Sequence, residues 1–216
     1  MKTKSFGKLL AAVVLSAGLV NAASANVYIT EWMYSGDEFI EFTNLGAGAV
    51  DFTGWSYDDD SRTAGTVSLS SFGTVAAGES VILSESAAAD FRAAWGLSAS
   101  VKVIGGNSVN LGRNDEINLY DEAGDLVDRL TYGDQSFVGT IRTQNASGIP
   151  ASLAALGANS VSQWQLSVAG DAAGSYLSTS GYIANPGVAP VPEPESFAML
   201  LAGLGLLGCI ARRRFT

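Results

Sequence analysis

Three adjacent carboxylates form the most concentrated chemical feature of this sequence. Asp58, Asp59 and Asp60 are followed by Ser61 and come directly after a predicted strand, so they should lie in a loop. Ca²⁺ binds about six to eight oxygen ligands, which clustered carboxylates are suited to supply. The run lacks the alternate spacing and the glycine of a known calcium-binding loop, so a solvated acidic turn is the competing interpretation. We predict no obligatory cofactor, with calcium at this turn as the open alternative.

A second set of carboxylates lies on two strands that should be neighbours. Glu31 belongs to the first strand, and Glu38 and Glu41 belong to the second. Two carboxyl groups about 5 to 9 Å apart can serve as acid and nucleophile in glycoside cleavage. This pattern leaves open a carboxylate-based polysaccharide hydrolase, or an accessory to an extracellular nuclease, beside a purely structural role for the same residues.

The residue types that are missing exclude several classes of site. The chain has no histidine, and its one cysteine, Cys209, lies in an apolar stretch near the C-terminus. A Ser-His-Asp triad, a Cys-His pair and a histidine-ligated zinc site therefore cannot be built. The region between the two ends of the chain also has no cysteine with which to form a disulfide.

The region between the two ends is strongly acidic. Residues 26–191 contain six basic and 19 acidic residues, a net charge of −13. Such a surface repels phosphate backbones, so we expect no nucleic-acid partner. Cations, basic surface proteins and hydrated polymers such as exopolysaccharide remain as partners.

The N-terminal 25 residues have the order of features that defines a signal peptide. Three lysines and no acid occupy the first eight residues, residues 9–20 are apolar and small, and Ala23-Ser24-Ala25 precedes Asn26. We predict cleavage by signal peptidase between Ala25 and Asn26, and export of the rest.

The C-terminus pairs an apolar stretch with a basic cluster. Residues 197–211 carry no charge, and Arg212, Arg213 and Arg214 follow at once. A helix of this length covers about 22 Å, less than the roughly 30 Å hydrocarbon core, but arginine snorkelling and local thinning allow it to span. We predict a short transmembrane helix whose arginines stay in the cytoplasm, so that the body lies outside the inner membrane.

A proline-rich motif stands directly before this helix. Pro192 and Pro194 flank Glu193, after a linker at 188–191. Each proline fixes its own φ and favours an extended predecessor, so neither helix nor sheet can absorb the motif. An exposed, extended strip of this kind is suited to the cleft of an enzyme.

The stretch between the two ends is predicted to be all-β. β-branched and aromatic residues alternate in short runs that Gly, Asn and Asp separate. The first two runs, 27–34 and 38–43, are joined by Ser35-Gly36-Asp37 and should form a hairpin. Further strands are predicted at 54–57, 66–69, 80–83, 101–104, 116–120, 126–132, 137–141 and 163–168.

One helix is predicted among these strands. It covers residues 87–95, with Ser84 or Ser86 as N-cap and Gly96 as C-cap. So many short strands in about 160 residues favour two packed sheets over a barrel. The four tryptophans are scattered over separate elements, which favours core packing over a sugar-stacking platform; they are Trp32, Trp55, Trp95 and Trp164.

The strand pattern resembles the lamin-tail domain, an immunoglobulin-like β-sandwich. The pieces that carry the resemblance are 29–34, 37–44, 51–56, 75–81, 114–124 and 126–132, and they span a core of 27–133. The resemblance implies that Glu38 and Asn44 fasten a strand and a turn. We expect residues 134–187 to pack on the same domain, which would then cover 26–187.

The last 25 residues, 192–216, resemble the PEP-CTERM sorting signal. In that family an exosortase, a membrane cysteine transpeptidase, recognises the tail, and its carriers are Gram-negative bacteria that make extracellular polysaccharide. The resemblance implies an inner-membrane intermediate with the body in the periplasm. It also implies delivery to the cell surface or the exopolysaccharide matrix, in biofilm. We therefore expect a binding or structural protein rather than an enzyme, fold class all-β with one short C-terminal transmembrane helix.

Overall fold

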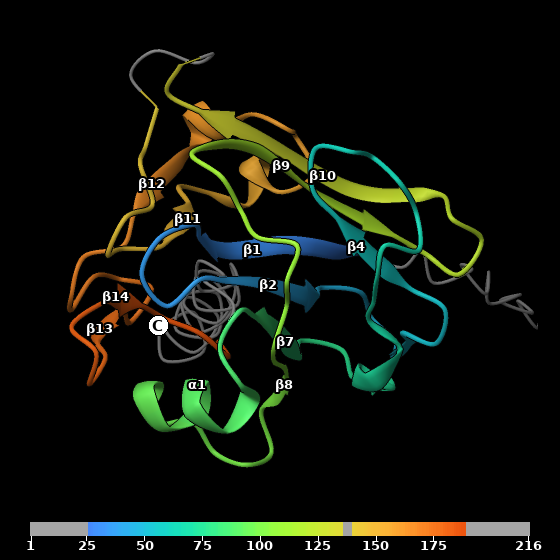
Figure 1. Ribbon diagram of the computed structural model, residues 1–216, viewed down its shortest axis with the longest axis horizontal. Helices are drawn as coiled ribbons and strands as arrows, with labels where there is room; N and C mark the ends of the chain where they lie inside the picture. The colour runs from blue at the N-terminus through green and yellow to red at the C-terminus, as the bar shows by residue number, and fades with distance from the viewer. Residues whose placement is uncertain (1–25, 136–139, 189–216) are drawn as a thin grey trace, which may run out of the picture.

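The structure is a computed structural model, and it describes residues 26–135 and 140–188. Two main sheets lie face to face (Figure 1). The large sheet has the order β12 (Trp164–Leu166), β11 (Gly148–Pro150), β1 (Val27–Met33), β2 (Phe39–Asn44), β7 (Ser80–Ser84), β8 (Lys102–Ile104). The small sheet has the order β10 (Leu126–Gly133), β9 (Asn114–Tyr120), β4 (Ser56–Asp58), β5 (Val67–Ser68). Neighbouring strands are antiparallel, except that β7 and β8 are parallel.

Short elements complete the described chain. β3 (Val50–Asp51) pairs with β6 (Thr74–Val75), and β13 (Tyr176–Leu177) pairs with β14 (Ile183–Ala184). Single 3-10 turns lie at Ser70–Phe72, Leu153–Ala155 and Val161–Gln163. Every predicted strand except 137–141 overlaps an observed strand, so the prediction of an all-β sandwich of two sheets is confirmed.

The predicted hairpin is present and carries a bulge. β1 and β2 pair from Val27 with Asn44 to Met33 with Phe39, and the register shifts between Ile29 and Glu31. There the Ile29 amide donates a hydrogen bond of 2.9 Å to Asp128 Oδ2 of β10. The bulge therefore ties the large sheet to the small one.

The only α-helix among the described residues is α1 (Ala88–Trp95), at the predicted place. Its C-cap is Gly96, in the left-handed conformation that glycine favours. The prediction of a serine N-cap was wrong, because Ala87 holds that position without a side-chain cap. Ser84 ends β7 instead, and its Oγ accepts a bond from the Ser86 amide.

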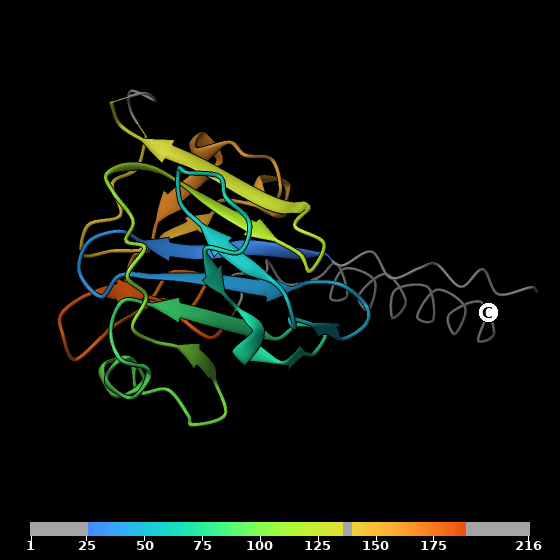
Figure 2. The same ribbon diagram turned by 45° about the vertical axis from the view of Figure 1, so that its right-hand side comes forward.

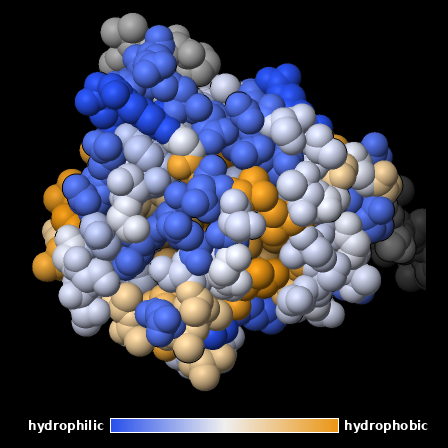
Figure 3. Space-filling model, viewed as in Figure 1, coloured by the Kyte–Doolittle hydropathy of each residue, from blue (hydrophilic) through white to orange (hydrophobic). Residues whose placement is uncertain are grey.

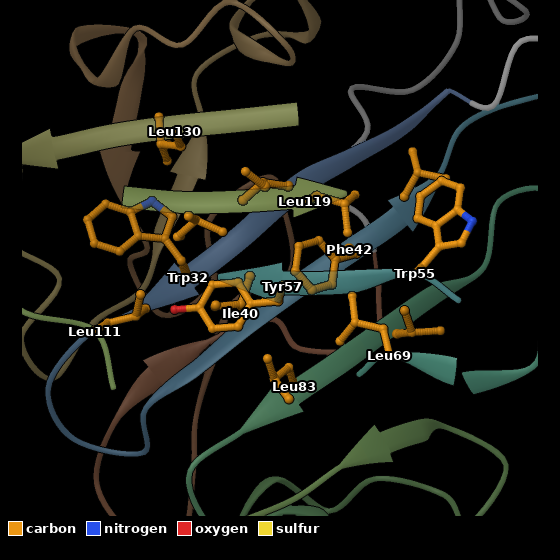
Figure 4. Close-up of a cluster of buried hydrophobic side chains, with 14 of the residues drawn as sticks. Trp32, Ile40, Phe42, Trp55, Tyr57, Leu69, Leu83, Leu111, Leu119 and Leu130 are labelled. Atoms are coloured by element: carbon orange, nitrogen blue, oxygen red, sulfur yellow. The ribbon is translucent and has the colours of Figure 1, made fainter. Parts of the chain in front are cut away.

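The main core lies between the two sheets (Figure 4). Alternation along β1 and β2 turns Trp32, Ile40 and Phe42 inward, where each is no more than 1% exposed. The small sheet contributes Tyr57 and Leu119 from the opposite side. Burial of each such side chain stabilises the fold by about 1.5 to 3 kcal/mol, so this layer holds the two sheets together.

A smaller cluster covers the other face of the large sheet. Met33, Phe39 and Ile82 point to this side and pack against Phe91 and Trp95 of α1. Figure 2 shows the helix beneath the sheet, and Figure 3 shows pale apolar residues in the same region, where Ala89 and Ala93 of the helix are exposed. The large sheet is therefore buried on both faces over part of its width.

Residues 140–188 pack on the same sandwich. β11 pairs with β1 through Gly148 and Trp32, and β12 pairs with β11, so the large sheet grows by two strands. The strand prediction at 137–141 was wrong for Thr140 and Ile141, and 137–139 lie outside the described residues. The chain here makes only an isolated bridge between Ser35 and Gln144 instead of a ladder.

Within residues 26–135 and 140–188, no helix is long and apolar enough to cross a membrane. The transmembrane helix predicted at 197–211 lies outside these residues.

Candidate functional site

The acidic run 58–60 divides where β4 ends. Asp58 is fully buried, and its Oδ2 accepts bonds from Ser61 Oγ and the Thr63 amide, both at 2.7 Å. Its carboxylate thus closes the turn, as aspartate side chains commonly do. Asp59 and Asp60 lie beyond the strand, half-buried and exposed respectively. Asp58 is therefore engaged in closing the turn, while Asp59 and Asp60 lie beyond β4.

Asp115, at the start of β9, joins the acidic group in place of Asp58. Asp59, Asp60 and Asp115 each bring a carboxylate oxygen within 4.8 Å of the others. Asp115 already accepts the Gly112 amide at 2.6 Å and the Glu116 amide at 2.8 Å. Three oxygens are about half of a Ca²⁺ shell, so calcium at this turn stays a prediction, now with Asp115 as the third candidate ligand.

An open pocket of about 250 Å³ adjoins the acidic group, and its lining carries both signs of charge. Arg62 holds Glu116 through two bonds, Nε to Oε2 at 2.7 Å and Nη2 to Oε1 at 2.6 Å. This guanidinium lowers the pKa of Glu116 to about 2. A fixed cation beside the carboxylates weakens the attraction for a metal ion. The pocket is lined by Asp60, Arg62, Asn114, Asp115, Glu116, Thr131 and Tyr132.

Two of the three predicted strand glutamates form a buried pair on the other side of the molecule. Glu31 of β1 and Glu41 of β2 are direct register partners, and both are 0% exposed. Glu41 Oε1 accepts the Thr30 hydroxyl at 2.7 Å, and Thr30 and Thr43 hydroxyls bond each other at 2.7 Å. The bulge in β1 places Thr30 beside this polar strip. The sheet therefore carries a carboxylate pair inside a small hydroxyl network.

A short C-terminal segment, residues 183–188, covers the pair; we call it the strap. The Asn185 amide donates to Glu31 Oε1 at 2.8 Å, and the Gly187 amide donates to Glu41 Oε2 at 2.6 Å. Ser147 Oγ also donates to Glu31 Oε1, while Glu31 Oε2 is buried without a partner. Substrate cannot reach the pair while the strap lies on it, so this arrangement does not suit glycoside cleavage.

Burial and like charge both act on the pair. Burial raises the pKa of Glu31 well above its ordinary range, and the neighbouring Glu41 raises it further. Burial raises the pKa of Glu41 to about 7, against the bonds from Thr30 and Gly187. Two adjacent carboxylates without a cation cannot both be charged cheaply, so near neutral pH the pair holds a proton.

The third glutamate and Asn44 act as fasteners. Glu38 Oε1 accepts the Leu111 amide at 2.7 Å, and burial raises the pKa of Glu38 to about 7. Asn44 Nδ2 donates to the carbonyls of Gly48, Val75 and Ala76 at 2.8, 3.1 and 3.2 Å. Both contacts hold a loop to the end of a strand, which is the role that the family resemblance implied.

The tryptophans are core residues, as their scatter predicted. All four are no more than 6% exposed. Trp32 packs on Tyr132 with ring centroids 3.9 Å apart, and Trp55 stacks on Phe52. The described residues therefore offer no tryptophan platform for a sugar ring.

Sequence reasoning missed the residues that complete each site. Arg62 and Asp115 are distant in sequence from each other and line one pocket because β9 pairs with β4. Ser147, Asn185 and Gly187 reach the glutamate pair from more than 100 residues away. Buried carboxylates on neighbouring strands require hydrogen-bond donors, but no local sequence pattern identifies which residues supply them.

Several predicted residues lie outside the described part of the chain. They are Ala25 of the signal-cleavage site, Pro192, Glu193 and Pro194 of the sorting motif, and the cluster Arg212, Arg213 and Arg214. Asn26, on the other side of the predicted cleavage, is described and exposed, and its carbonyl accepts the Leu45 amide at 2.8 Å.

Comparison with known protein families identifies two segments of the chain. Residues 21–134 match the Lamin Tail Domain, and residues 190–214 match the PEP-CTERM protein-sorting motif. A search of curated proteins finds no match. The sorting motif indicates an exported protein of a Gram-negative bacterium that an exosortase processes. With the matched sandwich covering more than half of its length, the chain belongs to the lamin tail domain family.

Proposed function

We propose that this protein is a non-catalytic binding or structural module that an exosortase delivers to the cell surface or the extracellular polysaccharide matrix. The observation that carries the proposal is a lamin tail domain followed by a PEP-CTERM motif at 190–214. Signal peptidase first cuts between Ala25 and Asn26. The apolar helix at 197–211 then holds the chain in the inner membrane, with the body in the periplasm, until the exosortase acts near Pro192-Glu193-Pro194.

The positions of the two ends of the sandwich support this topology. Val27 pairs with Asn44 at one end of the large sheet. The strap ends near the same place, because Gly187 approaches Val101, the residue before β8. The predicted signal peptide and the predicted C-terminal helix therefore attach at one end of the sandwich, and the rest of the surface stays available to partners.

The buried glutamates support a non-catalytic role. Glu31 and Glu41 are covered, and Glu38 is engaged with a loop amide. The exported segment has a net charge of −13, so its acidic faces favour basic surface proteins or cation-bridged polymers as partners.

Fractionation of cells with and without the exosortase tests the sorting step. We expect the processed protein outside the inner membrane in the wild type, and the unprocessed chain in the inner membrane of the deletion strain. A variant with Pro192, Glu193 and Pro194 all changed to Ala should behave like the deletion. The same distribution in all three strains would contradict the proposal.

Polymer turnover tests the alternative of a carboxylate-based hydrolase. The full chain and its Glu31→Gln, Glu38→Gln and Glu41→Gln variants are incubated with the polysaccharide of the producing strain and with DNA. We expect no turnover by any of them, and retention of the chain on a glycan array or on basic surface proteins. Turnover that one substitution abolishes without loss of folding would favour the enzyme.

A further inference from the structure

The last part of the strap, residues 185–188, is held on the carboxylate pair by main-chain donors and by the Asn185 side chain, whose Nδ2 donates to the Ala173 carbonyl. Its two central contacts run from the Asn185 and Gly187 amides to Glu31 and Glu41. The first part of the strap, Ile183–Ala184, is held separately as β14: it pairs with β13, the Ile183 amide donates to the Asn145 carbonyl at 2.9 Å, and the Ile183 carbonyl accepts the Ser147 amide at 2.9 Å. The large sheet makes no ladder with residues 185–188. Closure of this part of the strap thus depends on the state of the two glutamates.

No cation neutralises the pair within the described residues. The ion pairs there involve Glu79, Glu116 and Asp134, and none involves Glu31 or Glu41. The strap itself has no charged residue. If both carboxylates ionise, two like charges lie side by side in a dry site, and one oxygen, Glu31 Oε2, has no donor.

The surrounding elements supply few groups that could change this balance. Asp171, before β13, adds negative charge near Glu31. Burial and the charge of Glu31 raise the pKa of Tyr176 of β13. On the β7 and β8 side, Lys102 is engaged with Glu79 at 3.0 Å, and β7 offers the Ser80 hydroxyl, which bonds Thr43 at 2.7 Å. From α1, Arg92 bonds the Val101 carbonyl at 3.0 Å. Ionisation of the second glutamate therefore meets net negative surroundings.

We propose that residues 185–188, the last part of the strap, are releasable: they stay closed while at least one of Glu31 and Glu41 is protonated and open when both are ionised. In the opening step the remaining proton leaves the carboxyl group for solvent, water reaches both carboxylates, and the amides of Asn185 and Gly187 lose their acceptors. Glu41, whose pKa burial raises to about 7, ionises first; the strap responds when Glu31, whose pKa burial and the charge on Glu41 raise well above its ordinary range, loses the last proton.

Opening changes the chain in front of the sorting motif. With the strap closed, only residues 188–191 separate Gly187 from Pro192, at most about 14 Å of extended chain. Release of residues 185–187 adds three residues, or about 10 Å. The state of the strap therefore sets the distance between the sandwich and an exosortase bound to the motif. This step rests on the proposed function.

Hydrogen exchange of the full chain in mild detergent tests the strap directly. Mass spectrometry follows a peptide covering 183–188 and, as reference, peptides of β2 and β9, at pH 5.5 and pH 8.5 with correction for intrinsic exchange rates. We expect the protection of the strap to fall roughly tenfold at the higher pH, while the reference peptides keep theirs. Equal protection at both pH values, or parallel loss in β2, would overturn the proposal.

Matched variants separate the pair from other buried acids. Glu41→Gln, alone and with Glu31→Gln, mimics the protonated state and should keep the strap protected at pH 8.5. Glu38→Gln removes another acid with a raised pKa that does not touch the strap, so it should retain the wild-type response. A pH response that persists in the Glu31→Gln/Glu41→Gln chain would overturn the assignment.

Cleavage of the chain by the exosortase in cells provides a second, independent test. If the strap limits access to the motif, the double Gln variant should be cleaved several-fold more slowly than the Glu38→Gln variant at external pH 8. Hydrogen exchange needs no exosortase, so its result does not depend on whether the sorting proposal is correct. Likewise, a strap that does not open would not contradict sorting by the exosortase.

Discussion

The outer faces of the two sheets differ in how they stabilise their buried carboxylates. On the outer face of the small sheet, Glu116 lies under Arg62 and also accepts the Thr131 hydroxyl at 2.9 Å. On the outer face of the large sheet, Glu31 and Glu41 lie side by side with hydroxyl and amide donors only. The Arg62 guanidinium keeps Glu116 charged. Among the described residues no cation pairs with Glu31 or Glu41, so that pair retains a proton. The two faces should therefore respond to pH with opposite signs.

The largest expected effect is a loss of stability as pH rises through the range of the glutamate pair. The folded state raises the pKa of Glu41 to about 7, so it holds a proton that the unfolded chain releases near pH 4.5. The contribution is present below about pH 4.5 and is lost by about pH 7, with a size of about 3 kcal/mol. Urea unfolding of the full chain in mild detergent, followed by tryptophan fluorescence, measures it.

The Glu31→Gln/Glu41→Gln variant sharpens this prediction. Its stability should fall less steeply over the same range. Glu38 and Asp128 keep a smaller slope, because burial raises their pKa values to about 7 and about 6. A variant as steep as the wild type would show that the pair does not carry the effect.

Asn44→Ala should give the next largest loss of stability. It tests a neutral side chain that holds a loop, in contrast to the carboxylates. It removes three bonds to loop carbonyls and the acceptor of the Gly46 amide. We expect a loss of about 2 kcal/mol that does not change with pH, since no charge is involved. Denaturation at pH 5 and pH 8 checks this; Asn110→Ala, at an exposed asparagine, is the control and should cost little. A pH-dependent loss would contradict the neutral role.

Glu116→Gln should cost about 1 kcal/mol at pH 7, because Arg62 is largely exposed and water screens the pair. The wild type should also lose stability as pH falls from about 4.5 to about 2, since the folded state lowers the pKa of Glu116 to about 2. The variant should lose less over that range. Acid titration of unfolding for both proteins checks the sign, and identical acid curves would break the comparison between the faces.

Calcium should have the smallest effect. Asp59, Asp60 and Asp115 offer three oxygens, and Arg62 lines the adjoining pocket. We expect millimolar Ca²⁺ to raise the melting temperature by no more than about 2 °C over a chelator control, and Asp60→Asn to remove that shift. A shift of many degrees would indicate a fuller ligand shell than these residues provide.

Local sequence accounts for most of the strands and for the helix. The alternation in 27–34 and 38–43, with a short turn between them, is sufficient to place β1 and β2 side by side. The position of Gly96 ends α1 because glycine accepts the left-handed conformation. Two-residue strands such as β3 and β13, and the bridge at Gln144, escaped prediction because their pairing depends on partners distant in the chain.

Composition and motif order by themselves determined which chemistries are excluded and which sorting signal the chain carries. A chain without histidine cannot build a histidine-dependent site in any fold, and the PEP-CTERM motif is contiguous, so both follow from the sequence alone. Only the tertiary structure decided that Asp58 closes a turn, that Asp115 and Arg62 line one pocket, and that the strap covers Glu31 and Glu41. Those outcomes depend on contacts between residues far apart in sequence, which strand order and register create and no local pattern encodes.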